Sequence, residues 1–168
     1  RLAWGIKDLA IELGSLYPEL PEAFPQVAFS TVTYGRHHDV LERLLFELEA
    51  ELGPGARPLR FAEMGVACGA IGFHLLHRFP TMQYWGADPT IFRQVHEGYA
   101  RFGPRAQLHE VKSEELNAML PPEEQFDFVF IDGPHTYANV RNDILMWQPR
   151  VRRGGILAGH DFSGVHPP

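Results

Sequence analysis

Short apolar runs alternate with helical segments from Leu59 onward. The apolar runs predict five strands, at residues 59–66, 83–87, 107–111, 126–131 and 155–158. The segments between them predict helices at residues 70–78 and 90–102, a helix with Ser113 as its N-cap, and a helix at residues 138–147. Apolar strands separated by helices are typical of a parallel sheet covered on both faces. The sequence therefore predicts an α/β fold, a Rossmann-like doubly wound parallel sheet that is cut short after strand five.

The N-terminal part has a different spacing of apolar residues. Leucines recur at helical spacing from His38 to Leu52 and form one apolar stripe, which Gly53 ends. We therefore divide the single domain into an N-terminal helical segment, residues 1–58, and a core, residues 59–168. The leucine stripe faces either the chain's own sheet or a second subunit, so a homo-oligomer stays open.

Composition excludes several classes of protein. The 168 residues carry a formal net charge of −6, which does not favour binding to nucleic acid or to an anionic membrane. Cys68 is the only cysteine, so an internal disulfide is excluded and a reducing, cytoplasmic compartment fits. No apolar run is long enough to span a bilayer. Because the chain begins with Arg1 rather than methionine, we interpret it as a fragment or processed product.

A glycine-rich turn follows the first predicted strand. Its sequence, EMGVACG, contains Glu63, Gly65 and Gly69, with Ala67 where a nicotinamide-binding turn would carry its middle glycine. The wider turn suits a ligand without a phosphate, whose amino-acid end lies across it. Asp88 follows the second strand, 88 − 65 = 23 residues beyond Gly65, where a carboxylate binds ribose hydroxyls in such folds.

Four polar side chains follow the last two predicted strands. Asp132 and His135 come after strand 126–131, and His160 and Asp161 come after strand 155–158. The carboxyl ends of neighbouring parallel strands meet at one edge, which is where open α/β sheets bind ligands. Carboxylates and imidazoles there indicate a site for a metal and for proton transfer. By contrast, His74 and His77, on the helix after the glycine-rich turn, are expected at the surface.

The motifs EMGVACG, GADP, FIDGPHTY and GGILAGHDF together resemble the class I S-adenosylmethionine-dependent methyltransferases. The resemblance covers about residues 60–162 and is nearest to the small-molecule O-methyltransferases that use a divalent metal. It implies that S-adenosylmethionine is the cofactor. Carried over by position, the residues implied to bind it are Glu63, Gly65 and Gly69 at the methionine end, Asp88 at the ribose, Lys112 and Ser113 near the adenine, and Asp132.

The same resemblance implies a metal and a base. Asp132 stands where relatives have their first metal carboxylate, and His160 and Asp161 stand where they have a pair of acids. The histidine at position 160 departs from that pattern and bears on which metal, such as magnesium, would be preferred. His135 matches the general base of some relatives, with Asp132 as its catalytic neighbour. Relatives also carry two further strands after the fifth.

These features predict transfer of a methyl group to a hydroxyl of a small molecule, the expected partner of the chain. Two alternatives stay open. A methyltransferase-fold domain without activity would serve as a binding module or scaffold. A nicotinamide-dependent oxidoreductase is the other, although Ala67 argues against it.

Overall fold

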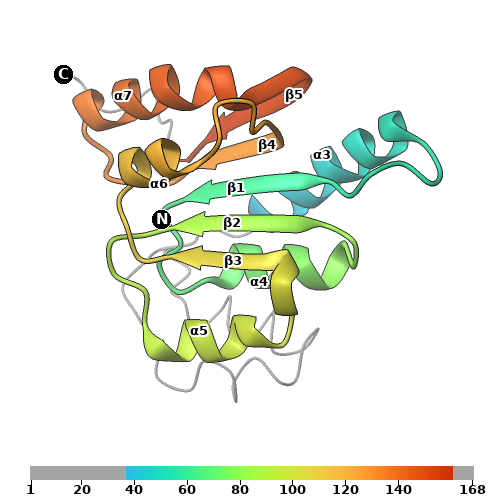
Figure 1. Ribbon diagram of the computed structural model, residues 1–168, viewed down its shortest axis with the longest axis horizontal. Coiled ribbons are helices and arrows are strands. Elements are labelled where there is room, and N and C mark those ends of the chain that lie inside the picture. Colours follow the sequence, from blue (N-terminus) through green and yellow to red (C-terminus); the bar gives the residue numbers. More distant parts are fainter. Residues whose placement is uncertain (1–36, 161–168) are drawn as a thin grey trace, which may run out of the picture.

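Five parallel strands form the centre of the molecule. The computed structural model describes residues 37–160. The strands are β1 (Arg60–Met64), β2 (Gln83–Ala87), β3 (Ala106–His109), β4 (Phe126–Ile131) and β5 (Val151–Gly159). They form one sheet in the order β3-β2-β1-β4-β5, with every neighbouring pair parallel. All five arrowheads in Figure 1 therefore end at the same edge of the sheet. The predicted doubly wound parallel sheet is confirmed.

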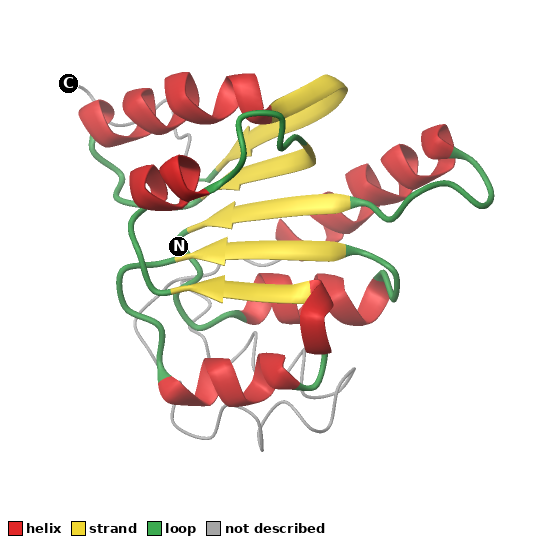
Figure 2. Cartoon of the chain, in the orientation of Figure 1, coloured by secondary structure: helices red, strands yellow, loops and turns green. Residues whose placement is uncertain are grey.

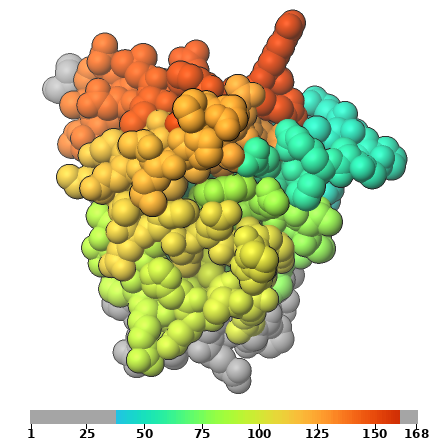
Figure 3. All heavy atoms as spheres, viewed as in Figure 1, coloured from blue at the N-terminus to red at the C-terminus, as the bar shows by residue number. Residues whose placement is uncertain are grey.

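Helices connect the strands and cover both faces of the sheet. They are α3 (His37–Leu52), α4 (Ala70–Arg78), α5 (Arg93–Ala100), α6 (Ser113–Met119) and α7 (Tyr137–Trp147), with short 3-10 turns at Gly103–Arg105 and Gln148–Arg150. Figure 2 shows that α6 and α7 lie apart from the other three helices. In the space-filling view, α6 and α7 cover the upper left of the visible face (Figure 3). No helix among residues 37–160 is long and apolar enough to cross a membrane.

Two apolar cores lie on the two faces of the sheet. The first joins α3, α4 and α5 to strand residues such as Phe61, Tyr84 and Phe128. The second joins α6 and α7, through Leu116 and Trp147, to the other side of the strands. The leucine stripe of α3 belongs to the first core, since Leu41, Leu45 and Leu48 are all buried there. The stripe therefore faces the chain's own fold.

A buried carboxylate fastens the amino-terminal edge of the sheet. Asp127 of β4 is fully buried and accepts two hydrogen bonds from the Arg57 guanidinium, at 2.7 and 2.8 Å. The backbone N–H of Arg60 and the side chain of Arg152 donate to the same carboxylate. Asp127 therefore ties together the segment before β1, β1 itself, β4 and β5. This arrangement lies opposite the edge that carries the predicted site residues.

Candidate active site

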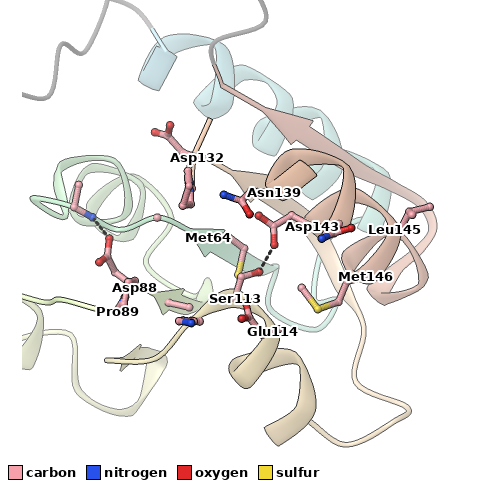
Figure 4. A pocket seen from close by; sticks show the side chains of 17 residues that line it. Met64, Asp88, Pro89, Ser113, Glu114, Asp132, Asn139, Asp143, Leu145 and Met146 are labelled. Atoms are coloured by element: carbon pink, nitrogen blue, oxygen red, sulfur yellow. Dashed lines mark hydrogen bonds between the residues drawn. The ribbon is translucent and has the colours of Figure 1, made fainter. Parts of the chain in front are cut away.

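A cavity of about 910 Å³ lies at the carboxyl edge of the sheet. Its wall includes residues from the ends of three strands and from two helices (Figure 4). The lining residues are Met64, Gly65, Ala67, Ala87, Asp88, Pro89, Lys112, Ser113, Glu114, Asp132, Gly133, Pro134, Asn139, Asn142, Asp143, Leu145 and Met146. A cavity of this size is in the range that small ligands and cofactors occupy.

Gly65 lets the ends of β1 and β4 approach each other closely. Its φ is +98°, and a Cβ at this position would lie 2.1 Å from the backbone oxygen of Asp132. The Asp132 amide donates to the carbonyl of Met64 at 2.7 Å, and the Gly65 amide donates to the carbonyl of Ala87 at 2.8 Å. Only glycine fits here, because the clash would be with backbone that cannot move aside. The turn thus fixes three strand ends against one another.

Asp88 is held in place by backbone amides. Its Oδ2 accepts a hydrogen bond from the Ala67 N–H, and its Oδ1 accepts one from the Thr90 N–H, both at 2.9 Å. Ala67 has a φ of +47°, which is uncommon for a residue with a side chain. The glycine-rich turn and the end of β2 therefore meet at the carboxylate of Asp88, which lines the cavity.

Glu63 lies beneath the cavity wall rather than in it. The side chain is 1% exposed, and its Oε2 accepts a hydrogen bond from the Tyr84 hydroxyl at 2.5 Å. Burial raises the pKa of Glu63 to about 8; the Tyr84 hydrogen bond opposes this shift, and the charges of Asp132 and Asp88 add to it. The carboxyl group is therefore largely protonated at neutral pH.

Gly69 also lies outside the lining residues. It precedes α4 with a φ of +74°, and a Cβ there would lie 2.8 Å from Val95 Cγ1 and 2.9 Å from Tyr99 Cε2. The Tyr99 hydroxyl donates to the Gly69 carbonyl at 2.6 Å. Gly69 thus allows α5 to pack closely against the start of α4.

Two of the three predicted metal ligands lie together. His160 Nδ1 is 3.3 Å from Asp132 Oδ1. Asp161 lies outside the described residues, so its place in the site stays a prediction. Within residues 37–160, no group of three or more His, Cys, Asp or Glu residues is arranged to hold a metal ion. The described residues therefore supply a pair of side chains at this edge, not a complete metal site.

His135 lies near this pair but outside the cavity wall. Its ring centroid is 6.4 Å from that of His160, and its side chain is exposed. The loop after β4 thus places Asp132 in the wall and His135 just beyond it. Both histidines are at the carboxyl edge, as the sequence predicted.

Ser113 forms part of a polar chain in the wall formed by α6 and α7. The prediction that Ser113 caps α6 is wrong by one residue: Lys112 is the N-cap, and its N–H donates to the Glu115 side chain. The Ser113 hydroxyl instead donates to Asp143 Oδ1, and it accepts a hydrogen bond from the indole Nε1 of Trp147, both at 2.7 Å. Lys112 has the extended backbone of an N-cap, and the Ser113 hydroxyl instead links α6 to α7.

Asp143 is a buried cavity residue that the sequence interpretation missed. It is only 7% exposed and lines the cavity from α7. The spacing of the residues indicates that position 143 is buried, because Val140, Asp143 and Trp147 fall on one face of a helix. An aspartate in such a stripe is unusual and points to a specific partner.

Comparison with known proteins identifies the family. A family model described as a methyltransferase domain matches residues 62–162, more than half of the chain. The chain therefore belongs to this methyltransferase family, which confirms the resemblance to class I S-adenosylmethionine-dependent methyltransferases. No curated protein sequence matches the chain.

Solved structures share the fold at low sequence identity. A proposed caffeoyl-CoA O-methyltransferase from Staphylococcus aureus has a TM-score of 0.69 at 14% identity, covering 92% of this chain and 72% of its own. A proposed O-methyltransferase from Klebsiella pneumoniae has a TM-score of 0.65 at 16% identity, covering 95% and 76%. A SAM-dependent methyltransferase from Agrobacterium tumefaciens has a TM-score of 0.59 at 11% identity, covering 82% and 49%.

Proposed function

We propose that this chain binds S-adenosylmethionine in the 910 Å³ cavity and transfers its methyl group to a hydroxyl of a small molecule. The observation that carries the proposal is the meeting of Gly65, Asp88 and Asp132, from three strand ends, in one cavity wall. The family match supports methyl transfer. The choice of a hydroxyl acceptor rests on the names of two fold relatives, the proposed O-methyltransferases from S. aureus and K. pneumoniae.

The charge of the cavity wall favours a cationic cofactor. Four carboxylate residues line it, Asp88, Glu114, Asp132 and Asp143, against a single basic residue, Lys112. The sulfonium of S-adenosylmethionine is positively charged, whereas the pyrophosphate of a dinucleotide is negatively charged. Like charges in a partly enclosed site repel strongly. The same wall therefore argues against the nicotinamide-dependent alternative.

Each predicted residue has a separate role in this proposal. Asp88 would accept hydrogen bonds from the ribose hydroxyls, since a carboxylate has lone pairs beyond the two that the amides use. Gly65 and the buried Glu63 would shape the methionine end. His135 would take the proton of the acceptor hydroxyl, and the main task of the site is to hold that oxygen in line with the methyl group.

A divalent metal such as magnesium stays a separate proposal. Asp132, His160 and Asp161 would hold it, and when bound it would orient the acceptor oxygens and lower the pKa of the hydroxyl. The 3.3 Å separation between Asp132 and His160 is consistent with two ligands of one ion. In activity assays, chelation should abolish turnover, and Asp132→Asn or Asp161→Asn should remove metal-dependent activity. If the two variants lost cofactor affinity as strongly as they lost metal-dependent activity, this would contradict a metal site that is separate from the cofactor site.

Calorimetry tests the proposed cofactor directly. S-Adenosylmethionine should bind at micromolar concentration, NAD should not bind, and Asp88→Ala should abolish binding. Asp39→Ala, which removes an exposed carboxylate on α3, is the matched control and should bind normally. Binding of NAD in place of S-adenosylmethionine would overturn the proposal.

Transfer to a panel of small phenols and alcohols, followed with a labelled methyl group, tests the reaction. Cofactor binding without transfer to any acceptor, with or without magnesium, would instead favour the inactive scaffold.

A further inference from the structure

A histidine of α4 is buried against α3, on the side of the fold that holds the first core. His74 is 3% exposed, and its Nε2 lies 2.8 Å from Oε2 of Glu42. An ionised carboxylate only accepts hydrogen bonds, so Nε2 of the neutral imidazole carries the proton and donates it to Glu42. A carboxylate of α3 therefore binds the neutral form of a buried histidine of α4.

The same carboxylate also binds an arginine of α4. Nε and Nη2 of Arg78 donate to Glu42 Oε1, at 2.9 and 2.7 Å. Burial alone would raise the pKa of Glu42, but the hydrogen bonds from Arg78 and His74 outweigh it and hold the pKa below its ordinary value. Glu42 therefore stays charged at mildly acidic pH and connects α3 to two side chains of α4.

A positive charge on His74 would lie among other positive groups. In the described part of the chain, the titratable groups around His74 are His38, Asp39 and Glu42 on α3 and Arg78 on α4. The ring of His38, itself buried, lies edge-on with its centroid 5.0 Å from that of His74. Asp39 is 3.2 Å from His38 but is more than half exposed. Glu42 is thus the close, shielded carboxylate for both cations of α4.

The surroundings of His74 disfavour its charged form. Burial is the largest cause that lowers the pKa of His74, and the charges of His38 and Arg78 add to it. The hydrogen bond and the charge of Glu42 act in the opposite direction without cancelling the shift. The folded arrangement of α3 on α4 therefore requires the neutral imidazole.

Helix α3 can separate from the rest while the sheet stays intact. It packs on the first core through Leu41, Leu45 and Leu48, and the strand pairings of the sheet do not include it. The turn that follows it contains Gly53 and Gly55, and nothing lies within 4 Å of the place that a Cβ would take on either. Such a peripheral element can open at a lower free energy than global unfolding.

We propose that His74 is an acid sensor: protonation of its buried imidazole releases α3 from α4 while the five-stranded sheet stays folded. In the released state the imidazole reaches water and takes up a proton that the closed state resists. The closed state is therefore most favoured above the ordinary pKa of 6.5 and becomes less favoured as the pH falls below it. Release would expose the leucine stripe of α3. The proposal is independent of methyl transfer, because none of these side chains lines the 910 Å³ cavity.

Amide hydrogen exchange of peptides from α3 and β4 tests the proposal. At pH 7.5 and at pH 5.5, α3 should be less protected than β4, because it opens without the sheet. Corrected for intrinsic exchange, the protection of α3 should fall about five- to tenfold from the higher pH to the lower, since opening takes up one proton. Equal protection of α3 and β4 would overturn the proposal, because α3 would then open only when the whole chain unfolds.

His74→Gln separates the sensor from other titrating groups. The glutamine amide can donate to Glu42 as Nε2 does but cannot gain a charge, so the protection of α3 should no longer fall with pH. His96→Gln, at an exposed histidine on α5, is the matched control and should keep the wild-type fall. The same fall in His74→Gln as in the wild type would overturn the role of His74.

The wild-type chain decides the matter where His74→Gln fails to fold. A five- to tenfold fall in the protection of α3, retained in His96→Gln, supports the proposal, since about one proton accounts for it. Protection of α3 that does not change between the two pH values overturns it.

Discussion

Glu63 shows how burial changes the chemistry of a single residue. Its carboxyl group is fully buried below the glycine-rich turn and hydrogen-bonded to Tyr84, and its pKa is about 8. In the folded chain it keeps a proton that the unfolded chain releases above the ordinary pKa of 4.5. The folded state therefore binds more protons between these two values, and stability falls as the pH rises through this window.

Replacing Glu63 by glutamine should remove this dependence. The amide side chain would stay neutral and could still accept the Tyr84 hydroxyl. Between about pH 5.5 and 7.5 the free energy of unfolding of Glu63→Gln, minus that of the wild type, should rise by roughly 1.4 kcal/mol per pH unit. Urea unfolding at several pH values measures this difference. Glu49→Gln, on the exposed face of α3, should give a flat difference, and a flat result for Glu63→Gln would contradict the buried proton.

Site residues that follow strands could be predicted, whereas those that depend on helix packing could not. Asp88 and Asp132 line the cavity because each directly follows a parallel strand, and the strands were recognisable. The expectation that His74 lies at the surface is wrong: it is 3% exposed, with its Nε2 2.8 Å from Glu42 of α3. Asp143 was missed for a similar reason, since its hydrogen-bond donor Ser113 lies on a different helix, α6.

The contact between Gly65 and Asp132 joins two elements of the site. Gly65→Ala would place a Cβ 2.1 Å from backbone, so the turn after β1 and the loop after β4 would have to separate. We expect a loss of about 2–4 kcal/mol in the free energy of unfolding and loss of cofactor binding, because the strain falls on the cavity wall. Thermal unfolding and calorimetry measure the two effects.

Gly103→Ala is the control for Gly65→Ala, because it tests the cost of backbone conformation without the steric contact. Gly103 has a φ of +60° but nothing within 4 Å of its missing Cβ. Its replacement should cost only about 1–2 kcal/mol and leave binding unchanged. Equal losses for both alanine variants would mean that conformation, not contact with Asp132, sets the requirement at position 65.

Asp127 makes a similar link at the opposite edge of the sheet. Burial alone would raise its pKa, but hydrogen bonds from Arg57 and Arg152 outweigh burial and hold the pKa below its ordinary value. The stabilisation is therefore present above the unfolded pKa of about 3.9 and is lost as the pH falls. Asp127→Asn should cost about 2–3 kcal/mol at pH 7 and less near pH 3, as measured by urea unfolding.

An exposed ion pair on α5 is the control for the buried carboxylate of Asp127. Glu97→Gln breaks the pair between Arg93 and Glu97 on the surface of α5, where both side chains are more than half exposed. Its cost should be no more than about 0.5 kcal/mol. If Asp127→Asn costs as little, the carboxylate does not fasten the edge of the sheet.

Element types could be read from the sequence more surely than element ends. The predicted bounds of β2, α4 and β4 agree with the structure. The fifth strand begins at Val151 instead of residue 155, because its first residues pair with Phe126 across an irregular register. The helix after β2 begins at Arg93 instead of residue 90, since Asp88 holds the Thr90 amide in a turn. The pairing of Val151 with Phe126 is a tertiary contact that leaves no local pattern, whereas the turn at Asp88 is a local contact over two residues.

At the scale of the whole molecule, the distribution of charge should affect binding. The chain carries a net charge of −6, and the cavity has four carboxylate residues against one lysine. S-Adenosylmethionine carries one more positive charge than its demethylated product. Raising NaCl from about 50 to 500 mM should therefore weaken binding of S-adenosylmethionine roughly threefold more than binding of S-adenosylhomocysteine. Calorimetry at both salt concentrations measures this ratio.

Glu114→Gln should reduce this salt effect, because it removes one of the four carboxylates. Identical salt dependence for the two compounds would mean that the cavity charge does not act on the sulfonium.

The strand order also constrains the sequence of events during synthesis of the chain. β1 lies between β2 and β4, although β3 precedes β4 along the chain. Until β4 leaves the ribosome, the nascent chain holds the glycine-rich turn, Asp88 and the cavity residues of α6, but lacks the part of the wall that β4 and α7 provide. Asp132, Gly133 and the residues of α7 arrive afterwards and must pair across the intervening segment, which is a slow, non-local step. Cofactor capture would thus occur only after β4 has docked, and the ligand would stabilise the molecule at the last stage of its folding.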